Sequence, residues 1–154
     1  MTGISIPDKI LYLKRSGIFE DLSIGELAAV ASVAEVVDYP LGEIIIQEGE
    51  SNDNLYLIVE GEVSVVRNPQ GKEGSKQVEV ELLGIGDPVG EMTFSEDNVC
   101  STTFRTRSKC RLLAVHKGDF TDIVKEYPQI GLNICKEFCK RLRKLYEKLE
   151  HCEN

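Results

Sequence analysis

The sequence contains no tryptophan and two histidines, and it has no uninterrupted run of about 20 apolar residues that could cross a membrane. Its first residues, MTGISIPDKILYLKRSG, lack the apolar block of a signal peptide, so we expect a cytoplasmic protein. His116 ends an apolar stretch and His151 lies near the C-terminus, and neither has an evident nucleophile or carboxylate partner. We therefore expect that the protein is not an enzyme.

Paired cysteines are also missing. The five cysteines are an odd number without a CxxC pair, which fits a reducing compartment. Metal binding by Cys135, Cys139, His151 and Cys152 is one interpretation, but structural zinc sites usually show paired short spacings. We expect no metal and interpret these cysteines as small apolar residues of a helix.

Basic residues are too few to balance the acidic ones, since 18 lysines and arginines stand against 26 aspartates and glutamates. The net charge of -8 would repel a phosphate polymer. The chain also ends at Asn154, shortly after the last predicted helix, which leaves no length for a helix-turn-helix. We expect no nucleic-acid partner.

The hydrophobic pattern predicts one mainly β domain with helices, spanning residues 1–154. Residues 1–40 are predicted to be helical, because Ser23 and Glu26 form a capping box and apolar residues then recur at helical spacing up to Pro40. Residues 41–116 consist of short β-branched runs without a crossover helix, which predicts an antiparallel β-roll of the double-stranded β-helix or jelly-roll type. Residues 117–150 return to the helical period and predict C-terminal helices, a short one around Phe120 and Ile123 and a long one from Pro128 to about Glu150.

The predicted C-terminal helix carries apolar residues at heptad spacing. They form a seam of Cys135, Phe138, Leu142, Leu145 and Leu149. A strict heptad seam favours a homodimer through this helix. The alternative, in which the helix packs on its own β-roll, stays open. The lysines and arginines between residues 136 and 150 are interpreted as a solvated face beside the seam.

Ligand-binding chemistry is concentrated in residues 86–103, where a predicted strand ends in glycines. Gly90 would let a ligand approach the backbone, and the Glu91 carboxylate could accept a hydrogen bond from a sugar hydroxyl. A glycine-rich turn with a solvated glutamate explains these residues equally well. The candidate ligand-binding residues are Gly90, Glu91, Met92, Cys100, Ser101, Thr102 and Thr103.

The motifs, in this order, resemble those of the cyclic-nucleotide-binding domain family, which includes regulatory subunits of cyclic-AMP-dependent protein kinase and bacterial catabolite activator proteins. Gly42 to Val66 is similar to the family pattern G-x-I-I-x-x-E-G-x-x-x-D/N-x-L-Y-x-I-x-x-G-x-V. Residues 86–91 resemble the G-D-x-F-G-E start of the phosphate-binding cassette, with Val89 in place of Phe. The resemblance implies a cassette at 86–103, a regulatory or sensor function, and cAMP or cGMP as ligand.

The sequence departs from this family where the phosphate should bind. The resemblance implies an arginine nine or ten residues after the glutamate, but Cys100 and Ser101 occupy these positions. Losing one charge-assisted hydrogen bond weakens binding by roughly ten- to a hundredfold. Two hypotheses follow: a weak cyclic-nucleotide sensor that signals through its C-terminal helix to an unidentified protein partner, or a degenerate dimerisation or docking module that binds no nucleotide.

Overall fold

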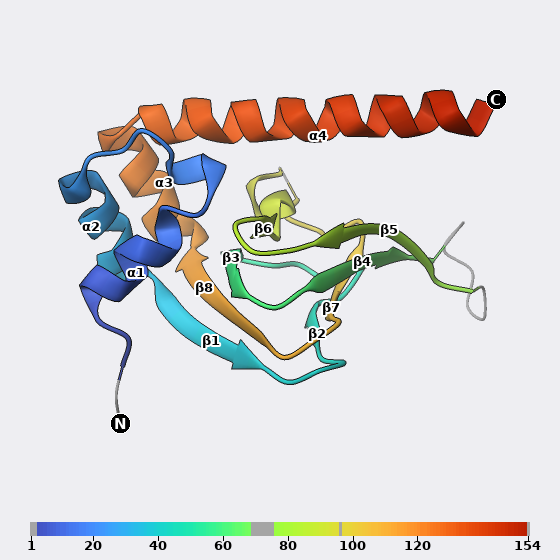
Figure 1. The fold of residues 1–154 in the computed structure, drawn as a ribbon, viewed down its shortest axis with the longest axis horizontal. Helices are drawn as coiled ribbons and strands as arrows, with labels where there is room; N and C mark the ends of the chain where they lie inside the picture. Colours follow the sequence, from blue (N-terminus) through green and yellow to red (C-terminus); the bar gives the residue numbers. More distant parts are fainter. Residues whose placement is uncertain (1–2, 69–75, 96, 154) are drawn as a thin grey trace.

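The computed structural model describes residues 3–68, 76–95 and 97–153. The helices α1, α2 and α3 gather at one end of a β-roll, and the last helix, α4, runs along one side of the molecule (Figure 1). None of the helices in the described ranges combines the length and the apolarity of a membrane span. The helices are α1 (Ile6–Leu13), η1 (Gly17–Phe19), α2 (Ile24–Val33), η3 (Glu91–Phe94), α3 (Lys117–Glu126) and α4 (Gln129–Glu153).

The described strands form two antiparallel sheets of four, in the orders β1-β8-β3-β6 and β2-β7-β4-β5. The two sheets pack face to face, which confirms the predicted β-roll with N-terminal helices and a long C-terminal helix. The strands are β1 (Glu35–Tyr39), β2 (Ile44–Ile46), β3 (Asn54–Glu60), β4 (Val63–Arg67), β5 (Val78–Leu83), β6 (Pro88–Val89), β7 (Thr103–Thr106) and β8 (Cys110–His116).

The predicted helical region 1–40 is wrong at its C-terminal end. The capping box of Ser23 and Glu26 is present, but α2 stops at Val33 and β1 begins at Glu35. β1 pairs with β8 along its whole length, which satisfies its backbone groups. Its β-branched Val36 and Val37 favour this extended form, so strand pairing overrides the helical spacing of apolar residues. The roll therefore begins at residue 35 and not at residue 41.

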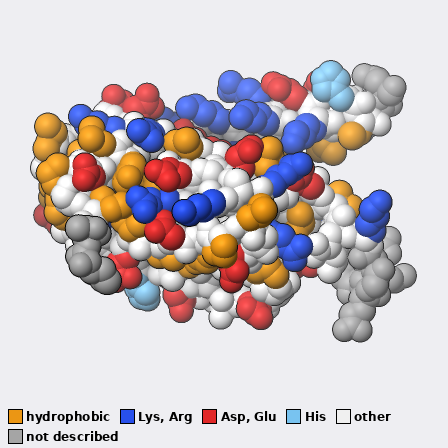
Figure 2. Space-filling model, turned by 60° about the horizontal axis from the view of Figure 1, so that its bottom comes forward, with side chains coloured by type: hydrophobic (Ala, Val, Ile, Leu, Met, Phe, Trp, Pro, Cys, Tyr) orange, Lys and Arg blue, Asp and Glu red, His pale blue; other side chains and the backbone are white. Residues whose placement is uncertain are grey.

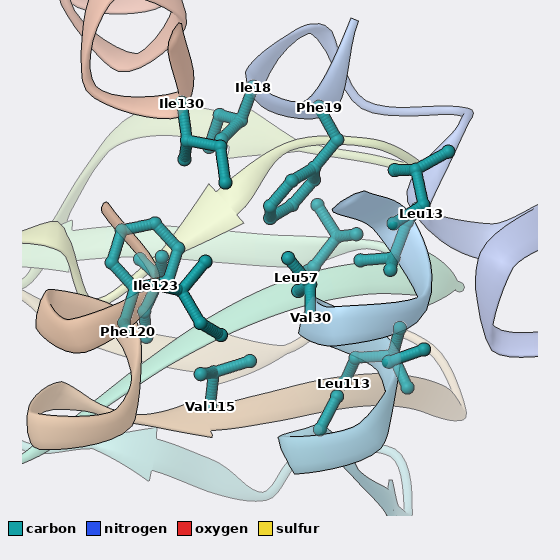
Figure 3. Close-up of a cluster of buried hydrophobic side chains, with 14 of the residues drawn as sticks. Leu13, Ile18, Phe19, Val30, Leu57, Leu113, Val115, Phe120, Ile123 and Ile130 are labelled. Atoms are coloured by element: carbon teal, nitrogen blue, oxygen red, sulfur yellow. The ribbon is translucent and has the colours of Figure 1, made fainter. Parts of the chain in front are cut away.

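The core consists of two clusters, one on each face of the sheet that contains β3 and β8. The first lies between this sheet and the helices, and Figure 3 shows Phe19 and Val30 from the N-terminal helices meeting Leu57, Leu113 and Phe120. The second fills the inside of the roll and includes Ile58, Val63, Leu83, Val89 and Leu112. Because Val89 is fully buried there, the residues that follow it are held firmly against the roll.

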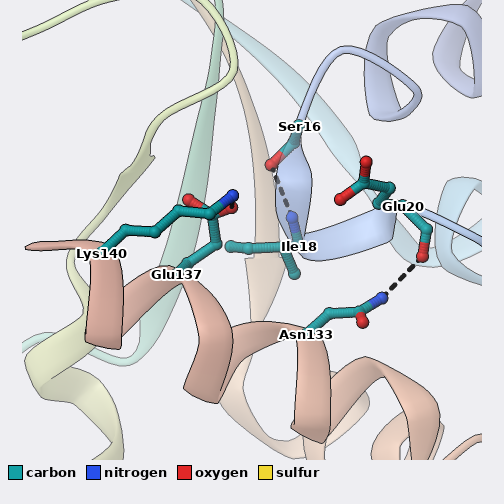
Figure 4. A network of polar contacts seen from close by, with 6 residues as sticks. All are labelled: Ser16, Ile18, Glu20, Asn133, Glu137 and Lys140. Atoms are coloured by element: carbon teal, nitrogen blue, oxygen red, sulfur yellow. Dashed lines mark hydrogen bonds and ion pairs between the residues drawn. The ribbon is translucent and has the colours of Figure 1, made fainter.

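The start of α4 is fixed to the N-terminal helices. Ile130 is fully buried in the first core cluster, and Asn133 is 2% exposed. Asn133 Nδ2 donates a hydrogen bond of 2.6 Å to the Glu20 carbonyl oxygen (Figure 4), and its Oδ1 accepts one from Gln129 Nε2. From this anchor the helix passes over β6 and β5 in Figure 1, which places its middle above the predicted cassette.

Replacing Asn133 with alanine is expected to reduce the free energy of unfolding by about 1–3 kcal/mol, because the carbonyl of Glu20 loses its donor inside the protein. Urea unfolding followed by circular dichroism measures the change. Lys136→Ala, on the exposed side of the same helix, is the control and should change stability by less than about 0.5 kcal/mol. Equal losses in the two variants would contradict this role for Asn133.

Candidate functional site

The cassette begins with a left-handed turn at Gly90, which has φ +86° and joins β6 to the short helix η3. A Cβ at this position would lie 2.8 Å from Ile46 Cδ1 and 2.9 Å from Asn52 Nδ2. The turn therefore requires glycine for its conformation and for contacts within the chain. This is a reason for Gly90 that differs from the ligand approach expected from the sequence.

The cassette is closed against the loop before β3 by polar contacts that sequence reasoning missed. Thr93 is fully buried and its hydroxyl donates to the Asn52 carbonyl oxygen at 2.6 Å. Asn98, itself left-handed with φ 45°, donates from Nδ2 to Asp53 Oδ1 at 2.7 Å. Amides and hydroxyls in a loop give little signal in a single sequence, because their partners lie more than 40 residues away.

Cys100 lies where the resemblance implies an arginine, and it is 1% exposed. Its backbone N–H donates to the Glu50 carbonyl oxygen at 3.0 Å, and its carbonyl accepts from Gly49 N at 2.8 Å. Burial raises the pKa of the Cys100 thiol, and the negative charge of Glu91 raises it further. Cys100 is thus close enough to Glu91 for the carboxylate charge to act on its thiol.

The other candidate residues differ in their accessibility. Met92 and Ser101 are exposed, and Thr102 is half-buried. Thr103 is buried in β7, where its hydroxyl oxygen accepts hydrogen bonds from Glu48 N at 2.9 Å and Gln47 Nε2 at 3.2 Å. The Thr103 oxygen is therefore already engaged by hydrogen bonds within the chain.

Glu91 has a cationic partner from α4. Arg141 Nη1 donates to Glu91 Oε1 at 2.8 Å, and Arg141 Nη2 donates to the Pro88 carbonyl oxygen at 3.0 Å. The Arg141 and Glu91 side chains are 19% and 22% exposed. The second carboxylate oxygen, Glu91 Oε2, is buried and accepts no hydrogen bond from any described residue. Glu91 is therefore largely buried and paired, which differs from the solvated glutamate of a glycine-rich turn that the sequence also allowed.

The sequence pattern predicts a solvated face for the basic residues of the last helix, and for Arg141 this prediction is wrong. Figure 2 shows the lysines and arginines gathered along the ridge that α4 forms at the top of the molecule. Lys136, Lys140, Arg143, Lys144 and Lys148 are exposed, as expected. Arg141 is turned toward the roll instead. It borders a hollow of about 350 Å³ between α4 and the segment around β5, which Glu81 and Asp87 also line.

The heptad seam has two parts. Leu142, Leu145 and Leu149 are 48%, 50% and 60% exposed, and Cys135 is also exposed. Phe138 is half-buried and lines an apolar groove of about 290 Å³ together with Ile134, Phe94 and Phe120. The centroids of the Phe94 and Phe120 rings lie 5.4 Å apart at this groove. The described residues therefore leave the C-terminal part of the seam uncovered.

The cysteines and histidines do not assemble into a site among the described residues. All five cysteines are free thiols, and no group of three or more potential ligands is arranged to hold a metal in the described ranges. His116 Nδ1 accepts a hydrogen bond of 3.1 Å from Gly118 N and caps α3. Its role in the structure is to begin a helix.

Comparison with known proteins gives relatives that are bacterial regulators. The chain is 26% identical to the "CRP-like cAMP-activated global transcriptional regulator" of Mycobacterium tuberculosis over 89% of its own length and 60% of the relative. It is 27% identical to the "Cyclic AMP receptor protein" of Thermus thermophilus, covering 85% of this chain and 59% of the relative. The chain therefore spans less than two thirds of these relatives.

Solved structures share the fold. The catabolite activator protein of Thermus thermophilus matches with a TM-score of 0.76 and 26% identity, over 88% of this chain and 62% of that one. The regulatory domain of Toxoplasma gondii PKA, crystallised with cAMP, matches with a TM-score of 0.75 and 18% identity, over 88% of this chain and 50% of that one. The second likeness concerns the fold alone.

The expectation of no nucleic-acid partner is wrong. The relatives are named transcriptional regulators, a class of protein that acts on DNA. The expectation relied on the net charge of -8 and on the last residue of the sequence, and both describe a stretch that matches about 60% of the relatives' length. The average charge of that stretch contains no information about DNA contacts made by other parts of a regulator.

The family itself is shown by a match to the cyclic nucleotide-binding domain over residues 36–127, from β1 to the end of α3. This match confirms the resemblance seen in the motifs. Because it covers more than half of the sequence, on a fold that the solved regulators share, the chain belongs to the cyclic nucleotide-binding domain family.

Proposed function

We propose that residues 1–154 form a cytoplasmic, non-enzymatic regulatory module that binds a cyclic nucleotide or a related ligand at residues 86–103 and signals through α4. The observation that carries this proposal is the buried oxygen Glu91 Oε2, which has no hydrogen-bond donor among residues 3–68, 76–95 and 97–153. A buried acceptor without a donor costs about 1–3 kcal/mol. A ribose hydroxyl would supply the donor, as it does for acidic residues in other nucleotide sites.

The proposed site consists of the residues predicted from the sequence, Gly90, Glu91, Met92, Cys100, Ser101, Thr102 and Thr103. Gly90 sets the direction of the turn, and Glu91 accepts from the sugar. Ser101 and Thr102 offer hydroxyl donors on the opposite arm of the cassette. Relatives are named for cAMP, so cAMP is the first ligand to test and cGMP the second.

The alternative is a degenerate module that docks or dimerises without a nucleotide. It is supported by Cys100 in place of a cation and by the pairing of Glu91 within the chain. The two functions differ in what a cation at the cassette position would achieve. In a working site it would strengthen binding, and in a degenerate one it would change nothing.

Cys100→Arg is expected to bind cAMP or cGMP at least about tenfold more tightly than the unchanged chain, because it adds a charge-assisted hydrogen bond to the phosphate. Isothermal titration calorimetry measures both affinities. Cys139→Arg adds the same charge on the exposed side of α4 and is the control. Ser101→Arg is a second variant at an exposed neighbour, should an arginine at the buried Cys100 prevent folding. Failure of all these proteins to bind would favour the degenerate module.

We also propose that a second copy of this chain covers the exposed part of the heptad seam. Leu142, Leu145 and Leu149 lie at heptad spacing and stay about half exposed, and an apolar stripe of this kind is complementary to itself.

Leu142→Asp is expected to convert a dimer of the chain into a monomer, because it buries a carboxylate in the seam. Sedimentation equilibrium over a range of concentrations measures the change. Leu132→Asp is the matched control, since Leu132 is 59% exposed on the same helix but lies outside the heptad series. A monomeric unchanged chain, or a dimer unaffected by Leu142→Asp, would contradict the proposed seam.

A further inference from the structure

The positive charge that the cassette lacks is present in the structure, but it comes from another element. We propose that Arg141 of α4 binds the anionic phosphate of the ligand in place of a cassette arginine. This inference rests on the proposed function and names the residue that determines its affinity. It also makes the ligand site depend on the position of α4.

The guanidinium group of Arg141 has N–H donors left for a phosphate. Arg141 reaches from α4 to both ends of the turn, with 2.8 Å from Nη1 to Glu91 Oε1 and 3.0 Å from Nη2 to the Pro88 carbonyl oxygen. A guanidinium group has five N–H donors in a fixed plane, so about three remain for a further acceptor. A phosphate oxygen beside the turn is an acceptor of this kind.

The two carboxylate oxygens of Glu91 differ in their hydrogen-bond partners. Its Oε1 atom holds Arg141, while its buried Oε2 atom has no donor among the described residues. A cyclic nucleotide carries a hydroxyl and a phosphate on the same ribose. The neighbouring Oε2 acceptor and Arg141 donors match these two groups, so one ligand would satisfy both.

Three other cations in the described part of the chain are paired with carboxylates or project from another face of the sheet. Arg107 pairs with Glu79 at 2.9 Å, and Lys140 pairs with Glu137 at 3.3 Å. Arg105 lies opposite Ser64 in the sheet, so its side chain projects from the face opposite to that of the buried Phe104. Arg141, by contrast, is paired directly with the cassette residue Glu91, and its side chain is 19% exposed.

A phosphate contact from Arg141 would link ligand binding to the position of α4. If the ligand's anion binds to a side chain of α4, the ligand stabilises the docked position of the helix, and the docked helix strengthens ligand binding to the same extent. A cation in the cassette itself would hold the phosphate without this dependence. In this chain, affinity and helix position are therefore linked through one residue.

The test is a calorimetric titration of the full chain with whichever of cAMP and cGMP binds more tightly. Arg141→Gln is expected to weaken binding by roughly ten- to a hundredfold, the effect of one charge-assisted hydrogen bond. Arg141→Lys keeps the positive charge, so it should lose less affinity than Arg141→Gln. Arg143→Gln removes the same charge from an exposed position on the same helix and should change affinity by less than about twofold.

A rescue variant separates a role in binding from a role in folding. Arg141→Gln combined with Cys100→Arg returns a cation to the cassette and should restore most of the lost affinity. Hydrogen exchange then provides a second measurement. Ligand should slow exchange of amides in residues 137–149 of the unchanged chain, but not in the rescued variant, whose phosphate no longer contacts α4.

The outcomes distinguish this inference from the proposed function. If Arg141→Gln binds as tightly as the unchanged chain or more tightly, Arg141 does not bind the phosphate, although the sensor function stands. Binding that appears only when Cys100→Arg is present would also overturn the role of Arg141. If neither the unchanged chain nor Cys100→Arg binds either nucleotide, the proposed function fails and this inference fails with it.

Discussion

The pairing of Glu91 with Arg141 is the interaction on which the arrangement of the site depends. A carboxylate that is largely removed from water needs a partner, because an unpaired buried charge is strongly destabilising. Here the partner belongs to an element that lies 50 residues away in the sequence. The pair therefore fixes the cassette and the long helix relative to each other. A substitution of Glu91 or of Arg141 is therefore expected to change the positions of both the cassette and α4.

The rest of the fold brings Glu91 and Arg141 into contact. Val89 is buried inside the roll, and the left-handed Gly90 then turns Glu91 toward α4. On the other side, Ile130 and Asn133 fix the start of α4 against the N-terminal helices. Arg141 follows Asn133 by about two helical turns, which brings it above the turn. The contact is thus a product of both core clusters together.

Much of this could be predicted from the sequence. The capping box before Leu27, the β-branched runs and the order of the family motifs gave the helices, the roll and the cassette, because each is a local pattern. The strand at Glu35–Tyr39 was missed because its apolar spacing also fits a helix and its pairing with β8 is not local. Arg141 was missed for the same reason. Its charge looks like that of its neighbours on α4, and its burial depends on an acceptor in a distant turn.

The central claim is that Glu91 presents an unpaired oxygen to a ribose hydroxyl while Arg141 holds the other oxygen. The most direct measurement compares the affinities of the chain for cAMP and for 2′-deoxy-cAMP, which differ by that hydroxyl alone. The account predicts that the deoxy compound binds roughly tenfold more weakly or worse, since Glu91 Oε2 then stays without a donor. Equal affinities for the two nucleotides would contradict it.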